Sequence, residues 1–205
     1  MSIDSIMQKL DKKILFRSRW KMSHGGETLL EKFLQDERIM NSMQPQAVYG
    51  YFPVYREDTS LIVNDSVRWE FPEIKGMRLS DHFHSKEEGG DIIPLSAVTI
   101  GEEAVILSKQ LYEKFDYAKY FLLYGLAAEL TETLAGIIHA RINTELGIKS
   151  SMRRSFGYPA CPDLSYQKEL LGYVKADRIH LHLSESNQLI PEFSTTALII
   201  HSVNK

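Results

Sequence analysis

The stretch LYGLAAELTETLAGIIHARI at residues 123–142 decides the fold, because it is long, free of proline and periodic. One face is broad and apolar and consists of Leu123, Leu126, Leu130, Leu134, Ile137 and Ile138. The opposite face carries small residues with one carboxylate and one imidazole, namely Gly125, Ala128, Glu132, Gly136 and His139. We therefore expect a long central helix that another element can approach closely, capped at its C-terminus by Gly147.

Helical patterns and strand patterns are grouped separately along the rest of the chain. Helical patterns cover residues 2–22 and 27–43, which Gly25-Gly26 separates, and residues 102–147, which break near Phe115–Asp116. A loop at 149–163 precedes a short helix at 165–173. Strand patterns occupy residues 46–55, 60–63, 67–71, 91–100, 180–183, 188–190 and 195–201. Pro94 suggests an edge strand or a bulge at 91–100.

This block order predicts the fold class. Strands and helices do not alternate as βαβ units, which favours an α+β fold with a twisted antiparallel sheet, a long central helix and flanking helices. The chain shows no internal repeat and no Pro/Gly/Ser-rich linker. We therefore expect a single domain over residues 1–205, with a helical N-terminal segment at 1–45 and an α+β core at 46–205.

Composition excludes several classes of protein. Of the 205 residues, 43% are hydrophobic and 25% charged, as in an ordinary soluble globular domain. The net charge of −3 offers no global basic field for nucleic acid. The most apolar stretch, Tyr120–Ala128, is about half the length that a bilayer requires, and residues 1–13 lack the apolar core of a secretory signal. We expect a cytoplasmic protein with neither a membrane nor a nucleic-acid partner.

The run RRSFGYPACPD at residues 153–163 is the most unusual local sequence. Its two prolines fix two φ angles and push the residues before them toward extended conformations, so the loop is stiff. A ligand could bind its free backbone N–H groups, which belong to Gly157, Tyr158, Ala160, Cys161 and Asp163. The guanidinium of Arg153 suits a carboxylate or phosphate. Alternatively, the loop is only a stiff connection in which Asp163 or Ser165 caps the next helix.

Other reactive side chains have simpler interpretations. The single cysteine, Cys161, excludes an internal disulfide and a thiolate-rich zinc site, and a packed role in the loop is favoured over a nucleophile. The H-x-H pairs His82/His84 and His180/His182 would point to one face if they lay in strands, where they could ligate metal. No third ligand pattern accompanies them, so surface or core histidines are favoured and no metal site is predicted.

The loop run resembles the R-x-x-x-G-Y-P-A-C-P-D signature of the activation (reactivation) domain of cobalamin-dependent methionine synthase. Four other segments resemble motifs of that family in the same order: AVYGYFPV at 47–54, AVTIGEE at 97–103, LAAELTETLAGIIHARI at 126–142 and LSES at 183–186. The resemblance extends from about residue 47 to the end.

The resemblance implies a site for S-adenosylmethionine (AdoMet) in this loop. By resemblance, Arg153 takes the carboxylate of the ligand's methionine part, and Glu132 lies near its cationic part. The cofactor-binding residues that follow are Glu132, Arg153, Ser155, Gly157, Tyr158 and Ala160. No self-contained catalytic residue is expected.

The resemblance also implies a function, namely a reactivation module or subunit that presents the AdoMet methyl group to cob(I)alamin during reductive methylation. The chain has no cobalamin-binding pattern such as D-x-H-x-x-G, so cobalamin is expected on a partner, a methionine synthase subunit without its own activation domain. Flavodoxin or another one-electron donor is the expected reductant. The alternative, suggested by the early end of the chain, is a non-catalytic interaction subunit of the same fold that has lost AdoMet binding.

Overall fold

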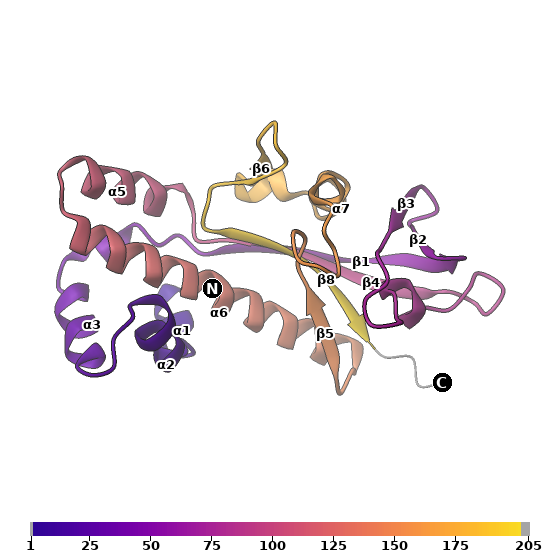
Figure 1. The fold of residues 1–205 in the computed structure, drawn as a ribbon, viewed down its shortest axis with the longest axis horizontal. Coiled ribbons are helices and arrows are strands. Elements are labelled where there is room, and N and C mark those ends of the chain that lie inside the picture. The colour runs from indigo at the N-terminus through magenta and orange to yellow at the C-terminus, as the bar shows by residue number, and fades with distance from the viewer. Residues whose placement is uncertain (1, 202–205) are drawn as a thin grey trace.

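A six-stranded antiparallel sheet forms the centre of the protein, in a computed structural model that describes residues 2–201 (Figure 1). The order of its strands is β3-β2-β1-β4-β8-β5. Their bounds are β1 Gln46–Glu57, β2 Ser60–Val63, β3 Val67–Glu70, β4 Asp91–Thr99, β5 Ser151–Arg154 and β8 Ser194–His201. A separate pair consists of β6 (His182–Leu183) and β7 (Leu189–Ile190). The antiparallel sheet with a long helix and flanking helices is the predicted α+β class.

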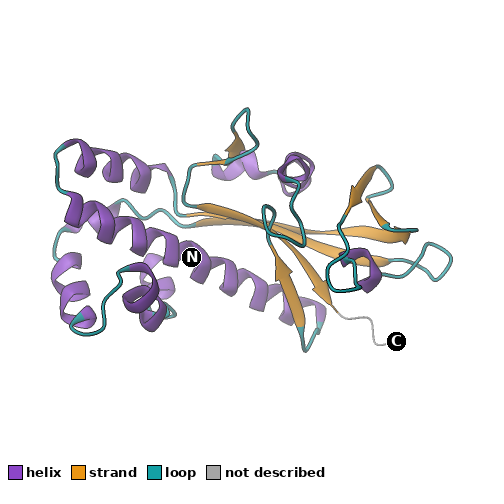
Figure 2. Cartoon of the chain, in the orientation of Figure 1, coloured by secondary structure: helices purple, strands orange, loops and turns teal. Residues whose placement is uncertain are grey.

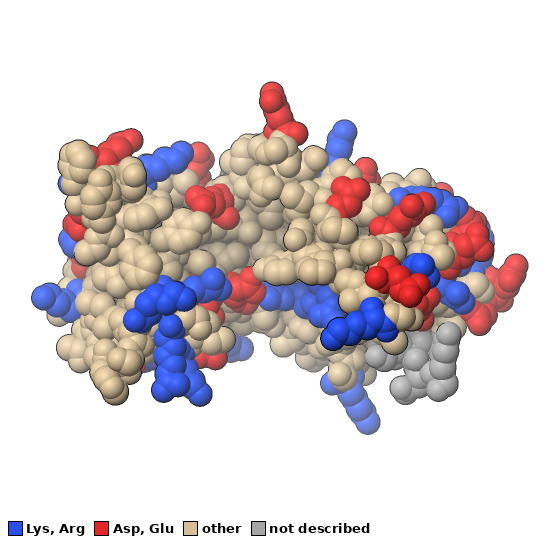
Figure 3. Space-filling view, in the orientation of Figure 1, with Lys and Arg blue, Asp and Glu red and all other residues tan. Residues whose placement is uncertain are grey.

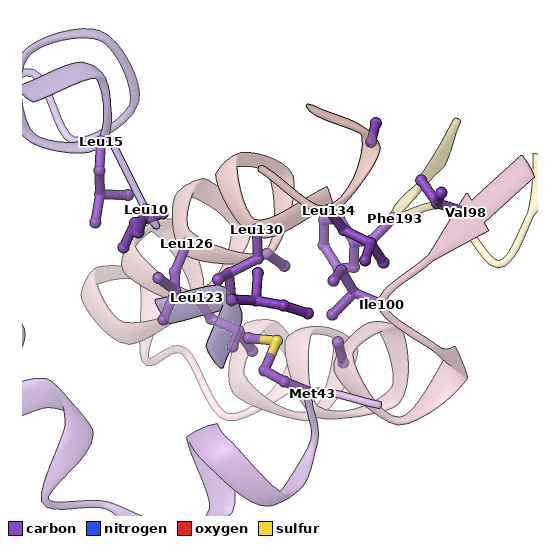
Figure 4. Packing of buried hydrophobic residues seen from close by; sticks show 14 of the residues in the cluster. Leu10, Leu15, Met43, Val98, Ile100, Leu123, Leu126, Leu130, Leu134 and Phe193 are labelled. Carbon is purple, nitrogen blue, oxygen red and sulfur yellow. The ribbon is translucent and has the colours of Figure 1, made fainter. Parts of the chain in front are cut away.

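One face of the sheet packs on the long helix α6 (Tyr117–Leu146), which follows α5 (Glu102–Glu113). The break between the two lies where the sequence predicted it: Phe115 adopts a positive φ of 60°, and the carboxylate of Asp116 accepts a hydrogen bond from the backbone N–H of Lys119. Gly147 ends α6 in the left-handed conformation, as expected. Buried leucines along α6 meet side chains from the sheet and the N-terminal helices (Figure 4).

The other face of the sheet carries a second, separate core. It is covered by α7 (Gln167–Val174) with the 3₁₀ turns Leu164–Tyr166 and Ala176–Ile179. Alternate residues of β8 separate the two cores: Ile199 belongs to the α6 side and Ile200 to the α7 side. Because side chains alternate along a strand, this alternation fixes which residues of the neighbouring β5 can reach α6.

The N-terminal segment packs against the first half of α6, at the end of the molecule where the helices gather (Figure 2). It consists of α1 (Ile3–Met7), α2 (Lys12–Ile14), a π-helical turn at Leu15–Arg19, α3 (Gly26–Leu34) and α4 (Glu37–Asn41). The continuous helix expected at 2–22 is therefore wrong: Asp11 caps α2 and starts a new turn. The expected division at Gly25-Gly26 is confirmed, because α3 begins at Gly26.

A buried anchor joins this segment to α6. The indole Nε1 of Trp20 donates to the carbonyl of Leu122 at 3.0 Å, and Arg19 pairs with the buried carboxylate of Glu129 at 3.0 Å. A Cβ on Gly125 would lie 2.8 Å from the Trp20 ring, so only glycine allows this close approach.

Two local expectations for the sheet need correction. The segment 149–163 is not all loop, because Ser151–Arg154 forms β5, which pairs with β8 at the edge of the sheet. The strand at Asp91–Thr99 is central rather than an edge, since it lies between β1 and β8. Pro94 is tolerated there because the pairing with β8 extends only from Leu95 to Thr99.

The length and composition of α6 would let it cross a membrane, and 56% of its most apolar 18-residue window is buried inside the protein. A core helix that packs on a sheet passes the same test of length and hydropathy. We therefore assign α6 to the core on the basis of its packing.

Candidate functional site

The site is built where the edge strand β5 faces the second half of α6. Arg153 pairs in register with Ile199 of β8, whose side chain lies in the α6 core. Side chains of paired residues share one face of a sheet, so Arg153 also points toward α6. There its guanidinium Nη2 bonds to the carboxylate of Glu132 at 2.5 Å. The structure thus brings together two residues that are 21 positions apart in the sequence.

The ion pair uses only one of the two terminal nitrogens of Arg153. The side chain of Arg153 is 21% exposed and that of Glu132 is 41% exposed. The second terminal nitrogen of Arg153, Nη1, is buried and has no hydrogen-bond partner among residues 2–201. A buried polar group of a charged side chain costs free energy when it lacks a partner. Arg153 therefore has one donor nitrogen left that a further acceptor would satisfy.

The glycine–proline run after β5 closes into a tight turn. The N–H of Gly157 donates to the carbonyl of Cys161 at 2.8 Å, and the N–H of Cys161 donates to the carbonyl of Tyr158 at 2.8 Å. These two groups were expected to be free for a ligand, and this expectation is wrong because the turn uses them itself. The N–H groups of Tyr158 and Ala160 have no partner within the described part of the chain.

Two side chains of the turn region are buried in the core on the α7 side of the sheet, and they anchor the turn. Phe156 is buried, and its ring packs edge-on to Trp69 at a centroid distance of 5.8 Å. Cys161 is 1% exposed, and burial raises the pKa of its thiol to about 12. A packed role for Cys161 is thus confirmed. Asp163 accepts a hydrogen bond from the N–H of Ser165 at 2.8 Å, so Asp163 is the cap of the following turn.

A pocket of about 400 Å³ opens between the ion pair and the turn. Five of the six predicted site residues line it: Glu132, Arg153, Ser155, Tyr158 and Ala160. The sixth, Gly157, does not; its φ of 86° shapes the turn instead. Three residues of the lining were not among the predicted site residues: Ile74, Arg154 and Pro159. Ile74 belongs to a turn that bridges to Met77, and no signal in residues 72–78 linked it to the distant loop.

A polar cluster lies beside the pocket on the same two elements. His139 Nε2 and Ser151 Oγ are 2.6 Å apart, and Ser151 Oγ donates to Asn143 Oδ1 at 2.6 Å. Burial, followed by the positive charge of Arg153, lowers the pKa of the His139 imidazole. His139 is therefore neutral at physiological pH.

A second hollow of about 380 Å³ lies among the N-terminal helices, where Figure 3 shows basic side chains gathered. Lys12, Lys13, Arg17 and His24 contribute to its lining, but these four are exposed. The pocket beside β5 differs because one of its lining residues, Arg153, has a buried donor nitrogen without a partner among the described residues. We therefore take the β5 pocket as the candidate site.

The histidine pairs do not form a metal site in the described region. His82 lies in a 3₁₀ turn and His180 adopts a left-handed conformation after another, so neither pair lies in one strand as the metal interpretation required. His84 instead contacts Asp91 at 3.1 Å. Across residues 2–201, no group of three or more His, Cys, Asp or Glu side chains could hold a metal ion.

Comparisons with known proteins agree on one relationship. The family model described as vitamin B12 dependent methionine synthase, activation domain, matches residues 4–204. Similar curated proteins are the methionine synthases of Mycobacterium tuberculosis, 29% identical over 245 residues, and Mycobacterium leprae, 29% identical over 191 residues. These alignments cover 94% and 75% of this chain but only 21% and 16% of those proteins.

A solved structure is also similar, that of the MetH reactivation domain bound to AdoHcy (S-adenosylhomocysteine). Its TM-score is 0.80 with 19% sequence identity, and the match covers 100% of this chain and 78% of that one. This likeness shows the fold.

Proposed function

The chain belongs to the family of activation domains of vitamin B12-dependent methionine synthase, and from this premise we propose that it binds AdoMet in the pocket beside β5. In this proposal it is the reactivation module that presents the AdoMet methyl group to cob(I)alamin on a partner. The solved relative of the same fold was crystallised with AdoHcy, the demethylated form of that ligand. The observation that carries the proposal is the buried Nη1 of Arg153, which has no partner among the described residues.

The charges around the pocket match those of AdoMet, which carries a carboxylate, an ammonium and a sulfonium. A carboxylate at Arg153 Nη1 would satisfy that nitrogen while Nη2 keeps its bond to Glu132. The Glu132 carboxylate, 41% exposed at the same pocket, offers a negative charge to the cationic part. Positive and negative protein groups are thus placed for the two ends of a zwitterionic ligand.

The remaining lining suits the uncharged part of the ligand. The N–H groups of Tyr158 and Ala160 can donate to polar ligand atoms, and the exposed ring of Tyr158 offers an apolar surface. Because the turn is fixed by its internal hydrogen bonds and by the buried Phe156, these groups lose little conformational freedom on binding.

The task of this chain is to position the ligand. When bound, AdoMet supplies a methyl group whose bond to sulfur breaks as a bond to cobalt forms, after one electron has reduced cob(II)alamin to cob(I)alamin, and AdoHcy remains. Arg153, Glu132 and the stiff turn would hold the ligand in one orientation, which reduces the entropic cost of the transfer. Because cobalt is the nucleophile, the chain needs no general base of its own.

The partners in this proposal are a cobalamin-binding methionine synthase subunit without its own activation domain and flavodoxin or another one-electron donor. The matched region is 21% and 16% of the two curated methionine synthases, and in this proposal the cobalamin-binding partner corresponds to a region outside it. Both partners act in the cytoplasm in this scheme.

Calorimetric titration with AdoMet and AdoHcy tests the site. Arg153→Met should weaken binding by roughly 30-fold, because a hydrogen bond to a charged group is worth about 2 kcal/mol. Arg154→Met is the matched control: it lines the same pocket but is exposed, and it should change affinity less than about threefold. Equal affinity of wild type and Arg153→Met would remove Arg153 from the site.

Reconstitution tests the function. A cobalamin-loaded methionine synthase without its activation domain should recover methionine formation only with this chain, AdoMet and a reductant. Association with that synthase in the absence of any AdoMet or AdoHcy binding would support the interaction-subunit alternative instead.

A further inference from the structure

The cluster of His139, Ser151 and Asn143 is polar, partly buried and outside the pocket lining. A serine hydroxyl has one proton, and that of Ser151 goes to the amide oxygen of Asn143. His139 Nε2 lies 2.6 Å from Ser151 Oγ and 3.4 Å from the amide nitrogen of Asn143, so the imidazole contacts both other members of the cluster.

This cluster provides a second attachment of β5 to α6. Ser151 and Arg153 are two residues apart, so their side chains lie on the same face of the strand. Their partners His139 and Glu132 are seven residues apart and lie on the same face of the helix, two turns from each other. β5 is thus joined to α6 at two places, by the Ser151–His139 contact and by the Arg153–Glu132 contact.

β5 needs this second attachment because it is an edge strand. It is only four residues long and is paired on one side, to β8. The four residue pairs with β8 fix the distance of β5 from that strand. Side-chain contacts with α6 fix the distance of β5 from the helix. If a ligand carboxylate also binds Arg153, the guanidinium divides its hydrogen bonds between the ligand and Glu132. The His139–Ser151 contact is not shared in this way and still holds β5 on α6.

We propose that His139 is a positioning residue for the ligand site: through Ser151 it holds β5 on α6 and so places Arg153 for an anionic ligand group. The identity of that ligand rests on the proposed function, but the coupling between His139 and Arg153 does not.

The coupling predicts a link between binding and protonation. His139 contacts Ser151 of β5 and Asn143 of α6. The charged or titratable groups at neighbouring positions are Arg153 on β5, its partner Glu132 on α6, and His201, which pairs with Ser151 on β8. The positive charge of Arg153 lowers the His139 pKa, after burial. An anion at Arg153 cancels part of that charge, so the pKa of His139 is higher in the complex. Affinity therefore increases as pH falls through the titration range of His139, and binding takes up a fraction of a proton.

A titration of His139 by NMR tests the coupling without any ligand. Its resonance is assigned with His139→Gln, and its pKa is measured in wild type and in Arg153→Met. The His139 pKa should rise in Arg153→Met, because the nearby positive charge is gone. An identical pKa in the two proteins would overturn the proposal.

Binding of AdoHcy, which lacks the sulfonium charge, tests the positioning role. His139→Ala and Ser151→Ala should each weaken binding by roughly tenfold, the effect of one lost hydrogen bond. His139→Gln, whose amide can still donate to Ser151, should stay within about threefold of wild type and lose the pH dependence. His182→Ala, an exposed histidine, is the control and should bind as wild type does.

The outcomes separate the two proposals. Wild-type affinity in both alanine variants, with an unchanged pH profile, would contradict the positioning role while leaving the AdoMet proposal intact. If wild type binds neither AdoHcy nor AdoMet, the proposed function fails, and the NMR titration still decides whether His139 and Arg153 are coupled.

Discussion

Two ion pairs lie three residues apart on α6 and differ in which partner is buried. In the first, the Glu129 carboxylate is 5% exposed and its partner Arg19 is 37% exposed. In the second, the order is reversed: Glu132 is 41% exposed and Arg153 is 21% exposed. The first pair joins the N-terminal segment to the helix, and the second joins β5 to it.

The difference in which partner is buried distinguishes a structural contact from a candidate binding site. The first pair lies against the contact between Gly125 and Trp20, which leaves no room for a ligand. The second pair faces a pocket of about 400 Å³, and one nitrogen of its arginine has no partner within residues 2–201. Two arginine–glutamate pairs that share α6 for their glutamates thus differ in role: one stabilises the fold, and the other leaves a donor for a ligand.

The largest expected effect comes from breaking the first pair. Arg19→Met leaves the Glu129 carboxylate buried without a partner and should lower the free energy of unfolding by about 2–3 kcal/mol, less than for a fully buried pair because Arg19 is partly exposed. Arg153→Met should cost about 1 kcal/mol or less, since Glu132 can turn toward water. Urea denaturation measures both, and equal losses would remove the distinction between the pairs.

Two glycines of α6 sharpen the comparison. Gly125→Ala should lower stability by about 1–2 kcal/mol, because its Cβ would lie 2.8 Å from the buried Trp20 ring. Gly136→Ala should raise stability by about 0.5–1 kcal/mol, because a Cβ there has no atom of the described chain within 4 Å and alanine favours the helix. Thermal denaturation compares the two variants with wild type. Wild-type stability of Gly125→Ala would show that Trp20 does not pack closely against α6.

A smaller effect concerns the reactivity of Cys161, the buried cysteine of the site loop. Because burial raises the pKa of the Cys161 thiol to about 12, its thiolate is scarce at pH 8. Alkylation by iodoacetamide should be at least about 100-fold slower in the native protein than in urea. Rapid labelling of the native protein would mean that the loop opens, and the rigid turn would then need revision.

Much of the fold follows from sequence periodicity. The long helix, its break before Asp116 and its end at Gly147 were predicted because apolar spacing and cap residues are local signals. The strand β5 was missed because Ser-Met-Arg-Arg has no apolar alternation, and its conformation depends on pairing with β8, which lies 40 residues later in the chain. The strand order and the division of the core into two could not be read from local patterns.

The site was predictable to the extent that it depends on motifs. The loop run and its resemblance pointed to Arg153 and Glu132, and the structure places them in contact. The loss of two free N–H groups to the turn was not predictable, because it depends on the exact backbone path from Gly157 to Cys161. The role of His139 emerged only from the position of β5 on α6.

A crystal structure of this chain with AdoHcy tests the proposed site most directly. We expect the ligand carboxylate to lie within hydrogen-bond distance of Arg153 Nη1, while Nη2 still contacts Glu132 and the adenosine part lies against the Tyr158–Ala160 turn. A ligand bound elsewhere, with Arg153 Nη1 still without an acceptor, would contradict it.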